Sequence, residues 1–338
     1  MGHESLRSVL LIQTAFLGDV ILATSLIEKL HQHYPEASID FLLRKGNENI
    51  LTGHPFLNEV LVFDKTSGKY RNLLRLISGI RKRKYDMVIN LQRFATTGLM
   101  AVFSGAQITV GFNKNPLSRL FTIRVPHSFD GVHEVERNHR LVAWMTDPEY
   151  ALPKLYPSSL NYEKIDPLRN NHYLCLAPAS VWFTKQFPAE KWIELVSQLP
   201  GDLILYLIGS RNDSDLAEKI RNSSRKSNIR NLCGQLDILD TAVLMKNAVL
   251  NIVNDSAPMH IASAMNAPVC AIYCSTLPRF GFGPLSEKSF IIETGEKLGC
   301  RPCGIHGRKS CPERHFKCAL GIETRRIAEI VTQELIAN

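Results

Sequence analysis

Residues 9–30 of the chain are VLLIQTAFLGDVILATSLIEKL, and their pattern predicts a strand, a loop and a helix in succession. The apolar run at 9–12 has the length and composition of a buried strand, and residues 13–18 follow it as a loop. Beyond Asp19, apolar residues recur at the spacing of a helix. Repeated along a chain, this unit builds a parallel sheet with helices on both faces.

The same unit recurs in two series, which a proline-rich segment separates. Strand-like apolar runs lie at 39–43, 60–63, 87–91 and 108–110 in the first series, and at 173–177, 203–208, 249–253 and 269–273 in the second. Residues 148–171 hold four prolines, which is typical of a linker. The sequence therefore predicts an α/β fold of two Rossmann-like, doubly wound parallel-sheet domains facing a cleft, with bounds near 1–160 and 161–338. The last helix, at about 322–338, is a candidate to pack back on the first domain.

The charge of the chain limits the classes of partner that it could bind but does not select one of them. The net charge of +8 on 338 residues favours nucleic acid, an anionic membrane surface or a phosphorylated sugar. The longest apolar runs are far shorter than the roughly 20 residues of a membrane span, and Gln13 interrupts the early run that could suggest a secretory signal. We therefore expect a cytoplasmic protein whose eight cysteines are thiols. The chain has no G-x-G-x-x-G motif, which leaves a dinucleotide-dependent oxidoreductase with little support.

The loop before the first helix carries the first group that could do chemistry. It contains Thr14 and Gly18, where the glycine would provide backbone freedom, and it ends at Asp19. A carboxylate at the start of a helix is either a catalytic base or an ordinary N-terminal cap. The residues alone leave both interpretations open.

Two loops of the second domain carry the other candidates. Residues 254–260, NDSAPMH, open a helix that Asp255 or Ser256 can cap, and the backbone amides there suit a phosphate. His260 would lie in the first turn, beside that anion or packed in the interdomain wall. Lys185 lies in the loop 177–188, just before the next helix, where its ammonium could neutralise a diphosphate leaving group, although a lone lysine is more often solvated.

Taken in order, three motifs resemble glycosyltransferase family 9, the ADP-heptose:lipopolysaccharide heptosyltransferases. They are Gly18-Asp19-Val20 before an amphipathic helix, Lys185-Gln186-Phe187-Pro188 with Trp192, and Asn254-Asp255-Ser256 with Met259, His260 and Ala262. The resemblance extends over nearly the whole chain and is closest to the second heptosyltransferase type. It implies the GT-B fold, with the acceptor held by the first domain and the nucleotide sugar by the second.

The resemblance also implies a role for each matching residue. Asp19 would be the general base, and Lys185 would contact the donor phosphates and stabilise the leaving group. The remaining donor-binding residues would be Ser180, Asp255, Ser256, Ala257 and His260. The acceptor-binding residues would be Thr14, Gly18 and Arg93. Ala257 stands where the family usually has glycine, and Arg211 stands where a carboxylate is often found beside the nucleoside.

The resulting expectation is an inverting transfer of heptose from ADP-heptose to the lipopolysaccharide inner core, with no cofactor required for catalysis. The expected partners are ADP-heptose, the lipopolysaccharide core acceptor and, by peripheral contact, the cytoplasmic face of the inner membrane, but not nucleic acid. The basic run Arg81-Lys82-Arg83-Lys84 either faces acidic lipid or core phosphates or is a solvated helix end. The alternatives are a GT-B transferase for another nucleotide sugar and a non-catalytic two-domain binding protein.

The cysteines fall into two groups. Cys300, Cys303, Cys311 and Cys318 form a C-x2-C-x7-C-x6-C pattern that could hold a structural zinc, with His306 and His315 as substitute ligands, or could remain reduced thiols in an irregular loop. The other four lie in or beside apolar runs and are expected to be buried thiols.

Overall fold

The computed structural model describes residues 6–66, 68–169, 172–224 and 226–337. The chain divides into two compact units, Met1–Tyr156 and Pro157–Asn338. Each unit contains one six-stranded sheet in which every strand is parallel to its neighbours. The prediction of two doubly wound parallel-sheet domains is therefore confirmed.

The first unit has the strand order β3-β2-β1-β4-β5-β6. Its strands are β1 (Ser8–Ile12), β2 (Ser38–Arg44), β3 (Glu59–Phe63), β4 (Met87–Asn90), β5 (Ile108–Phe112) and β6 (Ile123–Val125). Its helices are α1 (Leu17–His33), α2 (Lys69–Arg83), α3 (Ala95–Val102) and α4 (Glu134–His139), with short 3-10 turns η1 (Glu48–Leu51) and η2 (Ser118–Leu120). The order changes direction between β1 and β4, so the loops after these strands lie where doubly wound sheets bind ligands.

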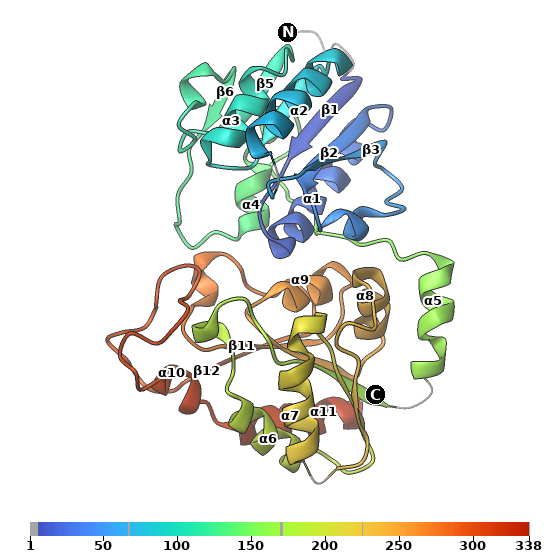
Figure 1. Cartoon of the computed structure of the whole chain (residues 1–338), viewed down its shortest axis with the longest axis vertical. Coiled ribbons are helices and arrows are strands. Elements are labelled where there is room, and N and C mark those ends of the chain that lie inside the picture. The colour runs from blue at the N-terminus through green and yellow to red at the C-terminus, as the bar shows by residue number, and fades with distance from the viewer. Residues whose placement is uncertain (1–5, 67, 170–171, 225, 338) are drawn as a thin grey trace. The chain divides into compact units, whose positions relative to one another are not determined.

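Side chains of β1 alternate between the two faces of this sheet. Leu10 and Ile12 are fully buried in a cluster with Leu73 of α2 and Met100 of α3. Helices α2 and α3 pack together over this face, and α1 and α4 pack together on the other (Figure 1). A strand buried on both faces must be apolar throughout, which is why residues 9–12 could be recognised from the sequence.

The second unit repeats the arrangement with the order β12-β11-β10-β7-β8-β9. Its strands are β7 (Tyr173–Ala177), β8 (Ile204–Leu207), β9 (Ile229–Asn231), β10 (Leu250–Asn254), β11 (Val269–Tyr273) and β12 (Ser289–Glu293). Its helices are α5 (Ser159–Ile165), α6 (Ala189–Gln198), α7 (Ser214–Ser223), α8 (Ile238–Lys246), α9 (Ala257–Ala264), α10 (Lys317–Leu320) and α11 (Thr324–Ala337), with 3-10 turns η3 (Asp166–Leu168), η4 (Phe183–Lys185), η5 (Arg211–Asp213) and η6 (Pro278–Phe280). Helix α11 packs against α6. The switch point here lies between β7 and β10.

Three strands were not predicted from the sequence, and all three are sheet edges. β6 and β9 have the sequences IRV and IRN, and β12 lies at the opposite edge of the second sheet. An edge strand has one neighbour and a partly exposed surface, so it needs no continuous apolar run. Over the described ranges, none of the helices has the length and apolar character that crossing a membrane requires.

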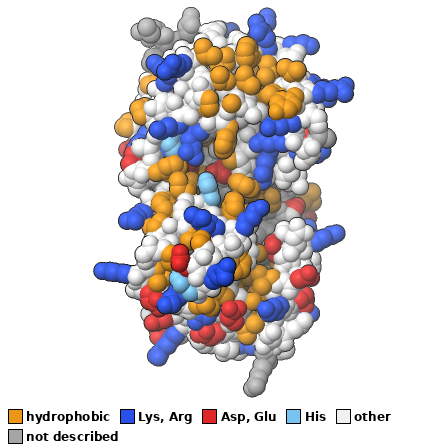
Figure 2. Space-filling view, turned by 60° about the vertical axis from the view of Figure 1, so that its left-hand side comes forward, with side chains coloured by type: hydrophobic (Ala, Val, Ile, Leu, Met, Phe, Trp, Pro, Cys, Tyr) orange, Lys and Arg blue, Asp and Glu red, His pale blue; other side chains and the backbone are white. Residues whose placement is uncertain are grey.

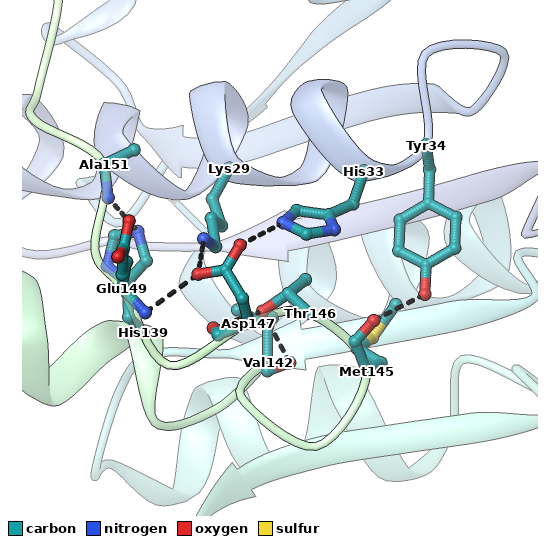
Figure 3. A network of polar contacts seen from close by, with 10 residues as sticks. All are labelled: Lys29, His33, Tyr34, His139, Val142, Met145, Thr146, Asp147, Glu149 and Ala151. Atoms are coloured by element: carbon teal, nitrogen blue, oxygen red, sulfur yellow. Dashed lines mark hydrogen bonds and ion pairs between the residues drawn. The ribbon is translucent and has the colours of Figure 1, made fainter.

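A polar network around the buried Lys29 joins α1 to the loop after α4 in the first unit. The side chain of Lys29 is only 3% exposed, and its ammonium pairs with the Asp147 carboxylate, which also accepts a hydrogen bond from His33 at 2.7 Å (Figure 3). A buried ammonium needs such a partner, because an unpaired charge in the interior is strongly destabilising. The network therefore fixes the loop that follows α4 to the helix that carries Asp19.

His139 belongs to the same region and is held in its neutral form. Its Nδ1 lies 2.7 Å from the Val135 carbonyl, and its Nε2 accepts from the Ala151 amide at 3.1 Å. This pair of contacts assigns the proton to Nδ1. Burial, and then the charge of Lys29, lower the pKa of His139 to about 4. Protonation of Nε2 would turn it into a donor that faces the Ala151 N–H, so the hydrogen bond between them would be lost.

We expect His139 to make the stability of the protein depend on pH. Its pKa in the folded state, about 4, lies below the ordinary value of 6.5, so its contribution is present above pH 6.5 and is lost as the pH falls toward 4. The melting temperature of the wild type should therefore decrease between pH 7.5 and pH 5. His139→Asn should melt lower at pH 7.5 and lose less over the same interval.

His172, an exposed histidine of the second unit, provides the control for this measurement. His172→Asn should keep the pH dependence of the wild type. Identical slopes of melting temperature against pH for the wild type and His139→Asn would contradict the assignment.

Candidate active site

The loops after β7 and β10 meet because these two strands are neighbours in the second sheet. The fully buried Asn254 ends β10, and its Nδ2 donates to the Pro178 carbonyl at 2.8 Å. Its Oδ1 accepts from the Phe187 amide at 2.9 Å. One side chain thus holds both ends of the loop that carries Lys185. The sequence indicated Asn254 only as part of a motif, and this bracing role was missed because it depends on the pairing of β7 with β10.

Lys185 and Asp255 form an ion pair with 2.8 Å between Nζ and Oδ2, and their side chains are 14% and 6% exposed. The Thr276 hydroxyl donates to the same carboxylate oxygen at 2.6 Å. Lys185 is therefore held in place and is not a solvated surface lysine. The arrangement presents an ammonium, fixed by a carboxylate, where η4 ends beside the start of α9.

The expectation that the side chain of Asp255 or Ser256 caps α9 is wrong, because in the described part of the chain neither accepts a hydrogen bond from the first turn of the helix. The Asp255 carboxylate binds Lys185 and Thr276 instead of the helix start. Ser256 occupies the N-cap position, but its hydroxyl donates to the Asn254 carbonyl at 3.3 Å. Ala257 is the first residue of the helix, and His260 is 6% exposed near its start. The N-terminal end of the helix dipole therefore adjoins the ion pair.

The remaining positions indicated for the donor lie in the loops after β7 and β8. The Ser180 carbonyl accepts from the Gln186 side chain at 2.6 Å, which braces the loop before Lys185. Arg211 is exposed and begins η5. In this turn the Asp213 carboxylate accepts from the Ser210 amide and hydroxyl, each at 2.7 Å.

In the first unit, Asp19 is the third residue of α1, and its Oδ2 accepts from the Phe16 amide at 3.2 Å. The carboxylate thus serves the helix start, which was one of the two interpretations of the sequence, and it is half-buried. Gly18 lies inside α1 and has helical backbone geometry. The expectation that Gly18 supplies backbone freedom to a loop is therefore wrong, because the helix begins one residue before it.

Lys65 is a cation of this edge that the sequence analysis missed. It follows β3, and its Nζ donates to the Thr14 carbonyl at 2.8 Å and to the Thr14 hydroxyl at 3.2 Å. Burial, and then the nearby charges of Arg44 and Lys69, lower the pKa of Lys65. A lysine two residues after a predicted strand was the available signal, since carboxyl ends of parallel strands share one edge.

Arg93 follows β4, the strand next to β1. Its guanidinium lies 5.1 Å from the centre of the Phe129 ring, and Arg137 lies 4.8 Å from the same ring. Burial, and then the charges of these two arginines, lower the pKa of the nearby His127 to about 4. Lys65 after β3 and Arg93 after β4 therefore place positive charge on both sides of β1 at this edge of the sheet, which suits an anionic ligand.

The four cysteines of residues 300–318 line one cavity of about 170 Å³ together with His315. Burial, and then the neighbouring thiols, raise the pKa of Cys318 to about 11. Within the described ranges, no three His, Cys, Asp or Glu side chains are grouped so that they could hold a metal ion. A structural zinc at Cys300, Cys303, Cys311 and Cys318 stays a prediction. The other four cysteines are buried free thiols, as expected.

Comparison with known proteins assigns the chain to a family. The model of glycosyltransferase family 9 (heptosyltransferase) matches residues 73–313. Lipopolysaccharide heptosyltransferase 3 of Escherichia coli K12 is 28% identical over 278 residues, which cover 77% of this chain and 80% of that protein. Lipopolysaccharide heptosyltransferase 2 of the same strain is 25% identical, with coverages of 84% and 87%.

Solved structures agree on the fold. E. coli ADP-heptose lps heptosyltransferase II superposes with a TM-score of 0.81 at 22% identity, covering 98% of this chain and 99% of that chain. A family 9 glycosyl transferase from Veillonella parvula gives a TM-score of 0.85 at 20% identity, with coverages of 99% and 98%. The family match extends over more than half of the sequence and confirms the resemblance carried by the three motifs, so the chain belongs to glycosyltransferase family 9, the heptosyltransferases.

Proposed function

We propose that this glycosyltransferase transfers heptose from ADP-heptose to the inner core of lipopolysaccharide, by a single displacement that inverts the anomeric carbon. The ion pair between Lys185 and Asp255 beside the start of α9 is the observation that carries the proposal. The names of the relatives supply the sugar and the acceptor, because two of them are lipopolysaccharide heptosyltransferases of E. coli.

Departure of the diphosphate is the step that Lys185 assists. An ammonium has three N–H donors, so Lys185 can keep its contact with Asp255 and donate to phosphate oxygens as well. A charge fixed in a partly buried site stabilises the developing negative charge without reorganising during the reaction. The dipole at the start of α9 adds to this field. In this proposal no cofactor takes part in the transfer.

The acceptor hydroxyl is activated by Asp19. A carboxylate can accept several hydrogen bonds, so the contact with the Phe16 amide is compatible with accepting a proton from the attacking hydroxyl. The same carboxylate then has two roles, in helix capping and in catalysis. Thr14 and Arg93, at the ends of β1 and β4, are proposed to bind the acceptor beside it.

Asp19→Asn separates the two roles of this carboxylate. Asparagine keeps an oxygen that can accept from the Phe16 amide but cannot take a proton, so turnover should fall by about 10²-fold or more, with little change in melting temperature or ADP affinity. Release of ADP from ADP-heptose and the gain of one heptose by core-truncated lipopolysaccharide measure turnover. Full activity of Asp19→Asn would contradict its role as the base. Wild-type protein that binds ADP-heptose without transfer would instead support a binding protein.

Lys185→Met tests the leaving-group role, because methionine keeps the aliphatic stem and removes the charge. We expect kcat/KM to fall by at least about 10²-fold, as for loss of one oxyanion donor, and ADP affinity to fall less. The single change leaves Asp255 buried without its cation, so the Lys185→Met/Asp255→Asn double variant serves as the stability control. The double variant should regain the melting temperature but not the activity. Changes below about threefold in both kcat/KM and ADP affinity would place the phosphate contacts elsewhere.

We further propose that α2 brings the enzyme to the anionic cytoplasmic face of the inner membrane. Helix α2 has the sequence KYRNLLRLISGIRKR, with six cations and no acidic residue. Its Tyr70 and Leu74 are 77% and 69% exposed, and Phe103, at the end of the uncharged neighbouring helix α3, is 49% exposed. Figure 2 shows hydrophobic side chains gathered on the first unit with Lys and Arg side chains around them. Exposed apolar groups framed by cations suit an anionic lipid surface.

One residue of the basic run 81–84, at the end of α2, already pairs with carboxylates of the first unit. Arg83 donates to Glu59 at 2.8 Å and lies 3.4 Å from Asp40. Arg81, Lys82 and Lys84 are exposed and remain candidates for lipid contact.

Vesicle binding tests this surface with a charge-matched control. Arg71→Glu/Lys82→Glu should weaken binding to phosphatidylglycerol vesicles by at least about 30-fold, since each cation near an anionic surface contributes about 1 kcal/mol. Lys219→Glu/Lys246→Glu makes the same change in net charge at exposed positions of the second unit and should keep most of the binding. An equal loss in both double variants would show that net charge, and not α2, directs the association.

A further inference from the structure

Residues 299–318, the cysteine-rich segment, have no part in the function proposed above, yet they lie directly against η4. We infer that this segment positions Lys185 for catalysis, with Thr184 and Gly307 as the two positioning residues. The inference rests on the proposed role of Lys185 at the leaving group. Three sets of contacts carry it, and all of them lie within the second unit.

Thr184 is the residue before Lys185, and three hydrogen bonds hold it, two with Arg308 of the cysteine-rich segment and one with Ser275, which follows β11. Its hydroxyl oxygen accepts from the Arg308 amide at 2.7 Å and from the Ser275 hydroxyl at 2.9 Å. Its own amide donates to the Arg308 carbonyl at 3.1 Å. Thr184 is 1% exposed, so loss of its hydroxyl would leave two donors in an interior that offers little water.

Gly307 lies against the aliphatic stem of Lys185. A β-carbon at this position would stand 2.9 Å from Lys185 Cγ and 3.0 Å from the Thr184 hydroxyl oxygen. Both distances are too short for ordinary contact, so only glycine lets the segment approach so closely. The stem of Lys185 is therefore confined on the side of the cysteine-rich segment, while its ammonium is confined by Asp255.

The cysteine-rich segment also contacts Ser275 and Thr276, the second of which binds Asp255. The Cys303 amide donates to the Ser275 carbonyl at 2.9 Å, and Arg301 donates to the Thr276 carbonyl at 2.8 Å. Thr276 in turn donates its hydroxyl to Asp255. One segment thus holds Lys185 through Thr184 and Asp255 through Thr276. A lysine side chain has high rotamer freedom, and confining it in advance places the charge where the leaving group needs it.

A pair of glycine substitutions tests the inference. Gly307 and Gly304 both have left-handed backbones, with φ of +76° and +80°, so an alanine strains the backbone similarly at each. Among the described residues, however, a β-carbon at Gly304 would meet no atom within 4 Å. We expect both variants to lower the melting temperature, Gly307→Ala at least as much as Gly304→Ala. Only Gly307→Ala should lose kcat/KM, by about tenfold or more, because a misplaced catalytic group can cost up to about 10²-fold.

Variants of Thr184 provide a second, independent measurement. Thr184→Val keeps the shape but removes the acceptor oxygen, whereas Thr184→Ser keeps the oxygen. We expect Thr184→Val to lower kcat more than it raises KM for ADP-heptose, and Thr184→Ser to retain most of the activity. Equal kcat/KM for Gly307→Ala and Gly304→Ala, or for Thr184→Val and Thr184→Ser, would overturn the inference.

A crystal structure of Gly307→Ala separates failure of this inference from failure of the proposed function. The inference requires that the 2.8 Å contact between Lys185 and Asp255 be lost or lengthened in this variant, whatever reaction the enzyme catalyses. An unchanged contact would overturn it. Full activity of Lys185→Met together with a displaced Lys185 in Gly307→Ala would instead overturn the catalytic role and leave the positioning intact.

Discussion

The ion pair between Lys185 and Asp255 is the interaction on which the organisation of the candidate site in the second unit depends. A largely buried ammonium and carboxylate must satisfy each other, so the loops that carry them have to meet. β7 and β10 make this possible, because they are adjacent and parallel and end at the same edge. Asn254 then braces the Lys185 loop, and Thr276 binds the second partner. The site is thus a consequence of strand order together with a few buried polar contacts.

The first unit also places its polar groups at the carboxyl ends of parallel strands, but there the positively charged side chains predominate. Asp19 lies at the start of α1, while Lys65, Arg44 and Arg93 supply positive charge around the same edge of the sheet. An anionic ligand would be attracted to such an edge, and in the proposed mechanism the Asp19 carboxylate within it removes a proton. In the proposed mechanism the two units therefore divide the chemistry between Asp19, the base, in the first and the held cation Lys185 in the second.

The residues whose place could be predicted from the sequence were those whose type is required by burial or by a motif. The apolar runs of β1, β7 and β10 were recognised because both faces of a parallel sheet are covered. The edges β6, β9 and β12 were not, because one open side removes that requirement. Asp255 was expected to cap α9 because a carboxylate before a helix usually does so. The structure pairs it with a lysine 70 positions earlier, and no local rule contains that information.

The sequence by itself determined the doubly wound architecture, the family and the loops that carry the candidate residues, because periodicity and short motifs are properties of neighbouring residues. Only the tertiary structure decided that Lys185 is held and not solvated, that Thr14 receives Lys65, and that the cysteine-rich segment lies against the stem of Lys185. These contacts join positions from 51 to more than 100 residues apart. They depend on which strands become neighbours, and strand order is fixed by packing the whole sheet and its helices, not by any single segment.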